Sequence, residues 1–387
     1  MANTPVKIFD TTLRDGLQSP NIHPITLAGR VAIGEALHAL GVDVIEAGFA
    51  IGSELDSQTI KTLAEKKFDT TICALARTLK ADIDAAGDAL KDAPQARIHT
   101  FISTSPLHRE KKLGMDKQQV LEQTQQGVRH ALSYVDDVQF SLEDYTRTEP
   151  DFAYQVIDTA IKAGATTINL PDTVGYSTPD EYAGLIKGVI NNVEGIDKAI
   201  LSTHCHDDLG LAVANSLAGV QSGARQIECS INGIGERAGN AAMEELVMAL
   251  QVRADILPFS TRIKTENFMT ISQLVQELTG LAVQKNKAIV GQNAFAHESG
   301  IHQHGINKDR RTYEILTPES VGQSASQLTL GVTSGRSGLL KKLEQLGFNT
   351  QNLTPEKATE IYLAFMAQAA EKRMTDDDIS TLAGKYF

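Results

Sequence analysis

The chain has 387 residues, 42% of them hydrophobic, and a formal net charge of −12 at pH 7. This length allows a large domain and a smaller one, and the composition excludes a mainly disordered protein. The acidic balance argues against nucleic acid as the main partner, because a phosphate polyanion needs a concentrated basic face. The N-terminus shows no basic-then-apolar signal and no run approaches membrane-spanning length, so we expect a cytoplasmic protein with no membrane partner.

Short apolar runs alternate with amphipathic helical patterns from residue 6 to about residue 254. The runs typical of strands are Val6–Asp10, Val42–Gly48, Thr70–Ala74, Arg97–Ser103, Asp137–Leu142, Thr166–Leu170, Ala199–His204 and Arg225–Ser230. Helical patterns between them include Leu27–Leu40, Gln118–Ser133, Asp151–Ala163, Pro179–Val193 and Leu209–Ser222. Eight βα units predict an α/β fold, a closed (β/α)8 TIM barrel. An open doubly wound sheet remains the alternative, because a count of units cannot show closure.

After about residue 258 this alternation stops. Helical patterns follow at Thr265–Thr279, Ser337–Leu346 and Pro355–Glu371, and the stretch from 291 to 305 is expected to be a polar loop. Its histidines, His297, His302 and His304, match no common metal-ligand spacing, so catalysis or substrate contact is favoured over a second metal site. We predict a TIM-barrel catalytic domain (1–258), a linker subdomain over the active site (259–325) and a helical subdomain (326–387), a small, mainly helical C-terminal region.

Two histidines end one of the predicted strands. Side chains alternate along a strand, so His204 and His206 point the same way while Cys205 points into the wall. Two converging imidazoles make half of a metal site, although histidines that are only hydrogen-bonded would show the same pattern. Cys73, Cys205 and Cys229 all lie in strand-like runs and are expected to be buried thiols rather than disulfides.

Further polar residues follow the other predicted strands. Because the active sites of TIM barrels lie at the C-terminal strand ends, these residues are expected to gather at one barrel mouth. They are Asp15, Glu46, His99, Ser141, Glu143, Asp172, Thr173, His204, His206, Asn232 and Asn240. A carboxylate, two imidazoles and an amide oxygen suit a divalent cation with open coordination positions.

Several motifs resemble those of the 2-isopropylmalate synthase family. They are Asp10–Gly16 (DTTLRDG), Phe140–Asp144 (FSLED), Asn169–Gly175 (NLPDTVG), His204–Ala212 (HCHDDLGLA), Asn232–Asn240 (NGIGERAGN) and Ser299–Gly305 (SGIHQHG). The barrel motifs alone also fit homocitrate synthase, citramalate synthase and the hydroxymethylglutaryl-CoA lyases, whereas Lys287–Gly322 is similar to isopropylmalate synthase in particular. Leu17 departs from the Glu that the synthases usually carry. The chain ends at Phe387, before that family's leucine-binding domain, so we expect no response to leucine.

The resemblance implies an acyltransferase of leucine biosynthesis, which condenses acetyl-CoA with 2-oxoisovalerate to give 2-isopropylmalate and CoA. It implies a divalent ion, Mn²⁺, Zn²⁺ or Mg²⁺, with Asp15, His204, His206 and Asn240 as ligands, and K⁺ as a candidate further cofactor. His99, Ser141 and Thr173 would contact the 2-oxo acid. Arg14 would stabilise the alkoxide that develops on the keto oxygen, because its guanidinium stays charged.

The proton-removing group is left open by the resemblance. Candidates are His302, assisted by Tyr313, and Glu143, which could instead orient Arg14 or a proton-carrying water; a histidine suits acid–base work near neutral pH. A homodimer is implied, in which His302 and Tyr313 of one subunit serve the other subunit's metal site.

Other 2-oxo acids remain alternative substrates, as in homocitrate, citramalate, Re-citrate and methylthioalkylmalate synthases. The pocket is expected to be lined by Glu46, Phe49, Ile51, Ser53 and His99. No obvious extra cation faces it, which favours a branched or short aliphatic substrate. A non-enzymatic metal-binding protein is disfavoured, because it leaves Arg14, Glu143 and His302 unexplained.

Overall fold

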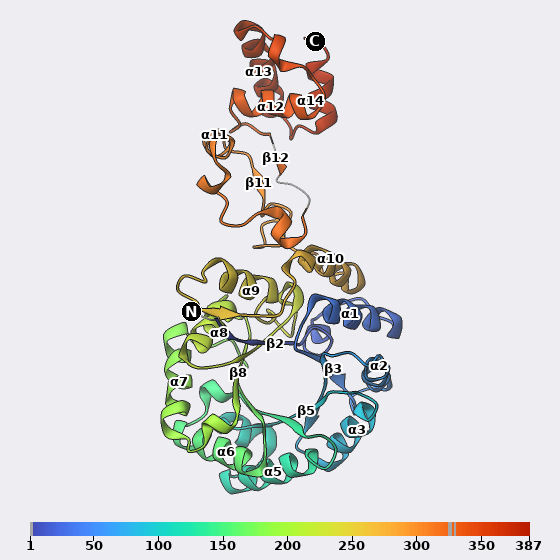
Figure 1. The fold of residues 1–387 in the computed structure, drawn as a ribbon, viewed down its shortest axis with the longest axis vertical. Helices are drawn as coiled ribbons and strands as arrows, with labels where there is room; N and C mark the ends of the chain where they lie inside the picture. The colour runs from blue at the N-terminus through green and yellow to red at the C-terminus, as the bar shows by residue number, and fades with distance from the viewer. Residues whose placement is uncertain (1–2, 324–326, 329) are drawn as a thin grey trace. The chain divides into compact units, whose positions relative to one another are not determined.

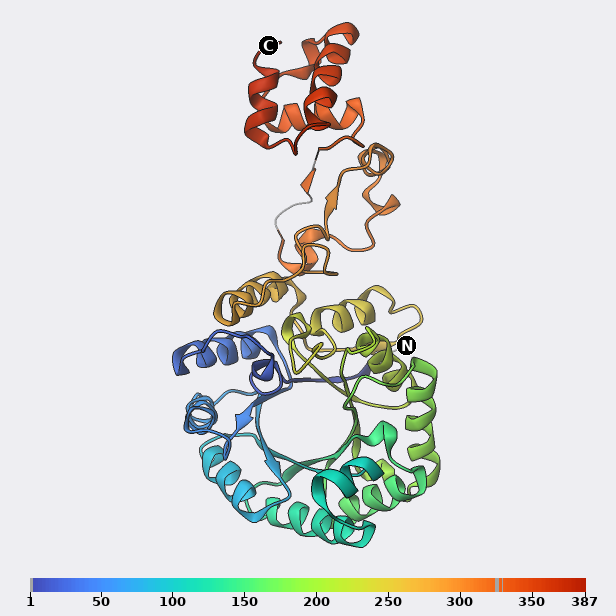
Figure 2. The same cartoon turned by 180° about the vertical axis from the view of Figure 1, so that it is seen from behind.

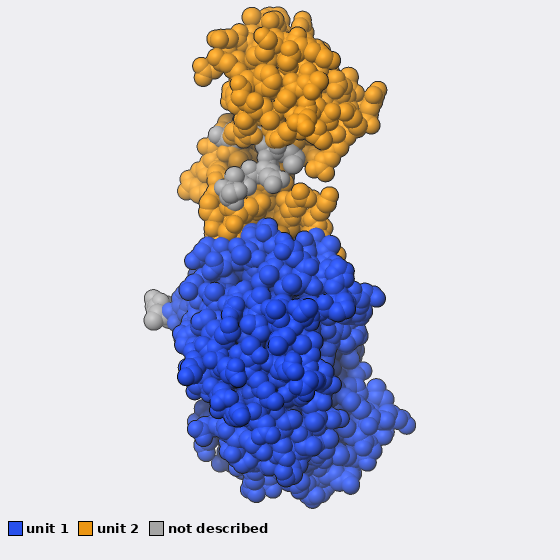
Figure 3. All heavy atoms as spheres, turned by 90° about the vertical axis from the view of Figure 1, so that its right-hand side faces the viewer, with its two compact units in different colours: residues 1–283 blue, residues 284–387 orange. Residues whose placement is uncertain are grey.

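The structure is a computed structural model that describes residues 3–323, 327–328 and 330–387. It divides into two compact units, residues 1–283 and 284–387, which Figure 3 colours separately. The domain boundary expected after residue 258 stays a prediction, and the one expected between residues 325 and 326 lies outside the described residues.

The first unit is a closed barrel of eight parallel strands that pair in chain order (Figure 1). The strands are β2 (Lys7–Asp10), β3 (Val44–Phe49), β4 (Thr71–Arg77), β5 (Ala96–Ser103), β6 (Asp137–Glu143), β7 (Thr167–Asp172), β8 (Ile200–Cys205) and β9 (Gln226–Cys229). The first strand, β2, pairs with the last, β9, over four residues, which closes the barrel. The predicted TIM barrel is therefore confirmed, and the open sheet is excluded.

Helices form a ring outside the strands, as the view from behind shows (Figure 2). They are α1 (Leu27–Leu40), α2 (Glu54–Glu65), α3 (Lys80–Leu90), α5 (Lys117–Ala131), α6 (Pro150–Ala163), α7 (Pro179–Asn192), α8 (Ala212–Ser222) and α9 (Met243–Val252), with the one-turn α4 (Pro106–His108) after β5. Helix α1 shows why the bounds fall where they do: the Thr26 hydroxyl accepts from the Gly29 amide at its start, and Gly41 ends it at φ 95°. Helix α10 (Phe268–Thr279) and a short pair, β1 (Thr4–Pro5) with β10 (Phe259–Ser260), complete the unit.

Part of the barrel interior is polar. Arg97 on β5 is only 2% exposed. Its Nη1 donates to Oε1 of Gln139 on β6 (3.1 Å) and to Oε1 of Gln226 on β9 (2.8 Å), and its Nε donates to Asp137 Oδ2 (2.9 Å). Side chains from three strands, β5, β6 and β9, thus meet below the strand ends, where a TIM barrel more often packs branched apolar residues.

We expect Arg97→Ala to destabilise the barrel by about 3–5 kcal/mol, because it leaves the buried amide oxygens of Gln139 and Gln226 without this donor. Urea unfolding followed by far-UV circular dichroism measures the change. Arg253→Ala, which removes an exposed arginine paired with Asp255, is the matched control and should leave the midpoint unchanged. Equal midpoints for the two variants would contradict the role given to the interior pairs.

The second unit contains α11 (Gly300–Lys308), α12 (Arg336–Gln345), α13 (Pro355–Ala369) and α14 (Asp376–Ala383), with β11 (Ala296–His297) parallel to β12 (Gln327–Leu328). Leu339, Leu343, Ile361, Phe365 and Ile379 are among its buried core residues.

The loop predicted for residues 291–305 is wrong from Gly300 onward, where α11 begins. Glycines at 300 and 305 lower the intrinsic helix propensity. Packing overrides it: a Cβ at position 305 would come 2.5 Å from the Tyr313 ring, so glycine lets that ring lie against the helix. Among the described residues, no helix combines the length and the apolar character that crossing a membrane requires.

Candidate functional site

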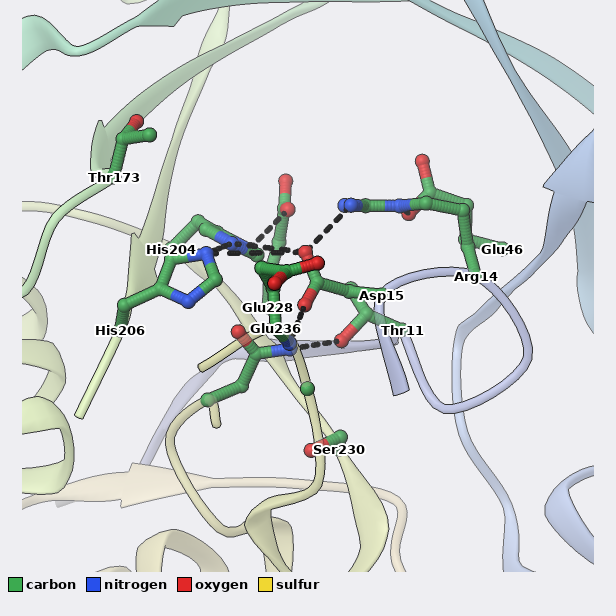
Figure 4. A network of polar contacts seen from close by, with 12 residues as sticks. Thr11, Arg14, Asp15, Glu46, Thr173, His204, His206, Glu228, Ser230 and Glu236 are labelled. Carbon is green, nitrogen blue, oxygen red and sulfur yellow. Dashed lines mark hydrogen bonds and ion pairs between the residues drawn. The ribbon is translucent and has the colours of Figure 1, made fainter. Parts of the chain in front are cut away.

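Three buried side chains from two loops and a strand end converge at the barrel mouth. Asp15 follows β2, His204 lies on β8 and His206 directly after it. Nε2 of His204 lies 3.2 Å from Nε2 of His206, and Asp15 Oδ2 lies 3.9 Å and 3.8 Å from these two nitrogens. In the part of the chain that the structure describes, these three residues form the one group of His, Cys, Asp and Glu side chains placed to hold a metal ion, and we call them the metal group. Figure 4 shows the three pointing toward one another.

The separations fit a metal centre. With metal–ligand bonds of about 2.1 Å, neighbouring ligand atoms lie about 3.0 Å apart in an octahedron and about 3.4 Å apart in a tetrahedron. The observed values of 3.2 to 3.9 Å exceed the tetrahedral spacing by up to about 0.5 Å and the octahedral spacing by up to about 0.9 Å, so the three side chains must draw together around a bound ion. Two imidazole nitrogens this close share either a proton or a cation, and the Asp15 oxygen beside both supplies the third ligand that a cation needs.

Asn240 supplies a further oxygen at this place. Its Nδ2 donates to Thr11 Oγ1 (3.2 Å), and its buried Oδ1 has no hydrogen-bond partner among the described residues. The loop that carries it passes very close: a Cβ on Gly235 would lie 2.8 Å from Asp15 Oδ1 and 2.9 Å from Asn240 Nδ2. Glycine is therefore needed at position 235, and the Gly-rich loop serves this close approach to the candidate ligands.

Arg14 is held by two carboxylates. Its Nη1 lies 2.6 Å from Oδ2 of Asp15, the oxygen that faces the histidines, and its Nε donates to Glu46 Oε2 (2.7 Å). The other oxygen of Glu46, Oε1, lies 2.6 Å from His99 Nδ1, and His99 Nε2 lies 2.6 Å from the Ser141 hydroxyl. The partner that orients Arg14 is thus Glu46, not Glu143, which the sequence offered for this part.

Charge within this cluster shifts several pKa values. Burial raises the pKa of the Asp15 carboxyl, but the charges of Arg14, His206 and His204 outweigh it and hold that pKa well below its usual range. Burial and the neighbouring His204 lower the pKa of His206 to about 4. Burial lowers the pKa of His204, but contact with Glu228 outweighs burial, so the net shift of this pKa is upward. The carboxylate is therefore ionised near neutral pH, as metal binding requires.

The other predicted contact residues line the same cavity of about 320 Å³. Thr173 accepts from the Asp144 amide through Oγ1 (2.9 Å) and stands to one side of the candidate ligands in Figure 4. Glu143 is already engaged, by Lys112 Nζ (2.5 Å) and the Ser103 hydroxyl (2.5 Å). Of the predicted lining residues, Phe49 and His99 are present; Glu46 lies fully buried beneath.

Two expectations about the pocket are wrong. Ile51 and Ser53 are not among its lining residues: Ile51 is 44% exposed, and the Ser53 hydroxyl caps α2 by accepting from the Asp56 amide. Two cations that the sequence did not place, Lys112 and Arg237, do line the cavity. Each has a carboxylate partner, because Arg237 binds Asp208 at 2.8 Å as Lys112 binds Glu143.

One wall of the cavity is apolar. It consists of Phe49, Leu75 and Phe101, which come from the consecutive strands β3, β4 and β5. Arg14, Asp15 and the histidines line the same cavity, so it offers both charged groups and apolar side chains to one small molecule.

His302 and Tyr313 lie in the second unit, so their approach to the metal group stays a prediction. The structure does bring them together: their rings stack with centroids 4.1 Å apart. His297 pairs instead with Glu314, at 3.3 Å. Tyr313 remains 43% exposed, which leaves the pair open to a ligand or a partner.

Two glutamates of the site, both lining the cavity, were missed by the sequence reasoning. Glu228 on β9 lies 3.0 Å from Nδ1 of His204, and the Glu236 amide donates to Asp15 Oδ1 (3.0 Å). A signal for Glu228 was present, because Gln226, Glu228 and Ser230 are polar at every second position of an otherwise apolar strand and so face the barrel interior.

The three cysteines are free and buried, as expected. Burial raises the pKa of the Cys205 thiol to about 12, which keeps it protonated beside two candidate ligands. It contributes no ligand to the metal group.

Comparison with known proteins identifies related sequences over nearly the whole chain. The HMGL-like family matches residues 5–275, and the family described as homocitrate synthase post-HMGL domain-like matches residues 289–373. The 2-isopropylmalate synthase of Rhodopirellula baltica is 53% identical over 383 residues, covering 99% of this chain and 72% of that protein. Those of Carboxydothermus hydrogenoformans and Aquifex aeolicus are 51% and 52% identical, covering 97% and 99% of this chain and 74% and 73% of theirs.

Solved structures agree in fold. A hydroxymethylglutaryl-CoA lyase from Pseudomonas aeruginosa superposes with a TM-score of 0.62 at 20% identity, covering 79% of this chain and 99% of that one. The HMG-CoA lyase from Brucella melitensis gives a TM-score of 0.62 at 20% identity, with 72% of this chain and 100% of that one covered. At this identity the likeness shows the barrel alone, whereas the relatives at above 50% identity extend over both units. The chain therefore belongs to the 2-isopropylmalate synthase family.

Proposed function

We propose that this chain catalyses the condensation of acetyl-CoA with 2-oxoisovalerate, giving 2-isopropylmalate and CoA. The methyl carbon of acetyl-CoA loses a proton and bonds to the keto carbon, the keto oxygen becomes a hydroxyl, and water cleaves the thioester. The observation that carries the proposal is one cavity that is lined by a candidate metal group, a fixed arginine and an apolar wall.

A divalent ion held by Asp15, His204, His206 and Asn240 would act as a Lewis acid on the ketone. Its candidates are Mn²⁺, Zn²⁺ and Mg²⁺, because imidazole, carboxylate and amide donors without thiolate accept all three and do not rank them. Arg14 places a permanent positive charge beside Asp15 Oδ2, the oxygen that faces the histidines. This charge would stabilise the negative charge that develops on the keto oxygen.

Glu46 orients Arg14 from below and positions His99, whose other nitrogen contacts Ser141. His99, Ser141 and Thr173 are thereby arranged to hold the carboxylate end of the 2-oxo acid. The apolar wall of Phe49, Leu75 and Phe101 then receives its aliphatic end, which supports a branched chain over a second carboxylate.

His302 is our candidate for the group that removes the methyl proton, with Tyr313 assisting. Both oxygens of the alternative, Glu143, already accept short hydrogen bonds from Lys112 and Ser103, so neither is free to approach the methyl group. The stacking of Tyr313 on His302 supports their joint action.

Comparison of substrates tests the function. CoA release, followed with a thiol reagent, should be at least about tenfold faster in kcat/KM with 2-oxoisovalerate than with pyruvate, 2-oxoglutarate, oxaloacetate or a methylthio-2-oxo acid, since one or two apolar contacts account for such a factor. Removal of the metal by a chelator should abolish the reaction, and Mn²⁺ should restore it. Preference for 2-oxoglutarate would instead assign a homocitrate synthase activity.

We also propose a homodimer in which His302 and Tyr313 serve the partner subunit's barrel, in the cytoplasm. His302→Ala and Asp15→Ala, each inactive alone, should then form a mixed dimer that regains one working site, because the metal group and His302 come from different subunits. The two variants are co-expressed under different tags, and the mixed species is purified and assayed for CoA release. No recovery in a verified mixed dimer would place His302 in its own subunit's site or outside catalysis.

A further inference from the structure

Glu228 links the metal group to the polar interior of the barrel. It is 1% exposed, and its Oε2 lies 3.0 Å from Nδ1 of His204, on the side of the ring away from the metal group. This contact lacks the geometry of a hydrogen bond, and neither atom has a hydrogen-bond partner among the described residues. A small rotation of the imidazole, of the kind that metal coordination imposes, aligns the ring N–H with the carboxylate.

The other oxygen of Glu228 is occupied. Oε1 accepts from Gln139 Nε2 (2.5 Å) and from the Ser202 hydroxyl (3.5 Å). Gln226 Nε2 in turn donates to Ser202 Oγ and to Gln139 Oε1, both at 2.9 Å.

Arg97 sets the direction of the hydrogen bonds in this network of interior side chains. A guanidinium only donates, so the Oε1 atoms of Gln139 and Gln226 must be the acceptors that face it. Each amide then presents its NH₂ group onward, and Gln139 can only donate to Glu228. The carboxylate can only accept, which requires a proton on His204 Nδ1; in the neutral imidazole this leaves the lone pair on Nε2.

We propose that Glu228 is a positioning residue for the metal: through Arg97, Gln139 and Glu228, the barrel interior fixes His204 in the one tautomer whose Nε2 can bind the ion. This inference rests on the proposed function, since it concerns that function's metal group. Glu228 touches no reacting atom, and its effect passes through the orientation of His204.

Glu228→Gln tests this direction of hydrogen bonding, because glutamine has nearly the same shape as glutamate. Gln139 still donates to the new Oε1, so the new NH₂ group faces His204 and favours the opposite tautomer, with the proton on Nε2. We expect Mn²⁺ binding to the metal-stripped full chain, measured by calorimetry, to weaken about 10- to 100-fold.

Exchange of the amide at position 139 and the carboxylate at position 228 should restore Mn²⁺ binding. In Gln139→Glu combined with Glu228→Gln, the carboxylate accepts from Arg97, the amide at 228 donates to it, and the amide oxygen accepts again from His204. Net charge and volume match the wild type, and we expect Mn²⁺ affinity within about threefold of it. Thr167→Val is the matched control, because this buried hydroxyl of the same barrel has no hydrogen-bond partner among the described residues.

Several outcomes overturn the inference. They are a Glu228→Gln variant that binds Mn²⁺ as the wild type does, and a folded double variant that does not recover. Nitrogen-15 chemical shifts of the His204 ring in the metal-stripped wild type at pH 8, assigned against His204→Asn, give an answer even where Glu228→Gln does not fold: Nδ1–H supports the proposal and Nε2–H overturns it. A wild type that binds no Mn²⁺, Zn²⁺ or Mg²⁺ fails the proposed function itself, which is a distinct result.

Discussion

His206→Ala is expected to lose its metal and, with it, essentially all CoA release. One of the two imidazoles that face each other at 3.2 Å is removed, and the ligands that remain bind a divalent ion at least about 100-fold more weakly. Metal content after dialysis and turnover at saturating substrate are measured together. His130→Ala removes a surface histidine paired with Asp84 and serves as the control, with both quantities unchanged. Full occupancy and normal turnover in His206→Ala would show that the three side chains are not the metal site.

Arg14→Lys is expected to lower kcat by about 10²- to 10³-fold, with KM for the 2-oxo acid within about threefold of the wild type. Lysine keeps the charge but cannot bridge Glu46 and Asp15 as the planar guanidinium does, so the charge is no longer fixed where the alkoxide develops. Steady-state kinetics separate the two constants. Arg253→Lys, at an exposed ion pair, is the control. An unchanged kcat with a raised KM would mean that Arg14 only binds the ground state.

Much of the barrel was predictable because its signals are local. Every strand of the barrel overlaps a predicted run; for example, β5 was expected at Arg97–Ser103 and observed at Ala96–Ser103. Strands of a parallel barrel are buried on both sides, so each reads as an apolar run between helical patterns. In the second unit this failed at α11, where close packing against glycines, rather than propensity, decides the conformation.

The metal group was predictable for a similar reason, since strand alternation and the rule for strand ends suffice to bring Asp15, His204 and His206 together. Which carboxylate contacts which cation was not predictable. Glu46 and Glu143 both lie at strand ends, and only the three-dimensional distances show that Glu46 reaches Arg14 while Lys112 takes Glu143. A pattern gives the face on which a side chain lies, but not which of several neighbours it contacts.

The barrel seam has a consequence for synthesis on the ribosome. The Thr11 hydroxyl accepts from Asn240, the Asp15 carboxylate from the Glu236 amide, and the Ser19 hydroxyl from the Gly235 amide, so the metal group joins the first strand to the loop after the last. These contacts span 216 to 229 positions of the sequence. A nascent chain therefore cannot assemble these side chains until Asn240 has left the exit tunnel, and a metal ion bound by them would stabilise the closed barrel over partly wound forms only after that point.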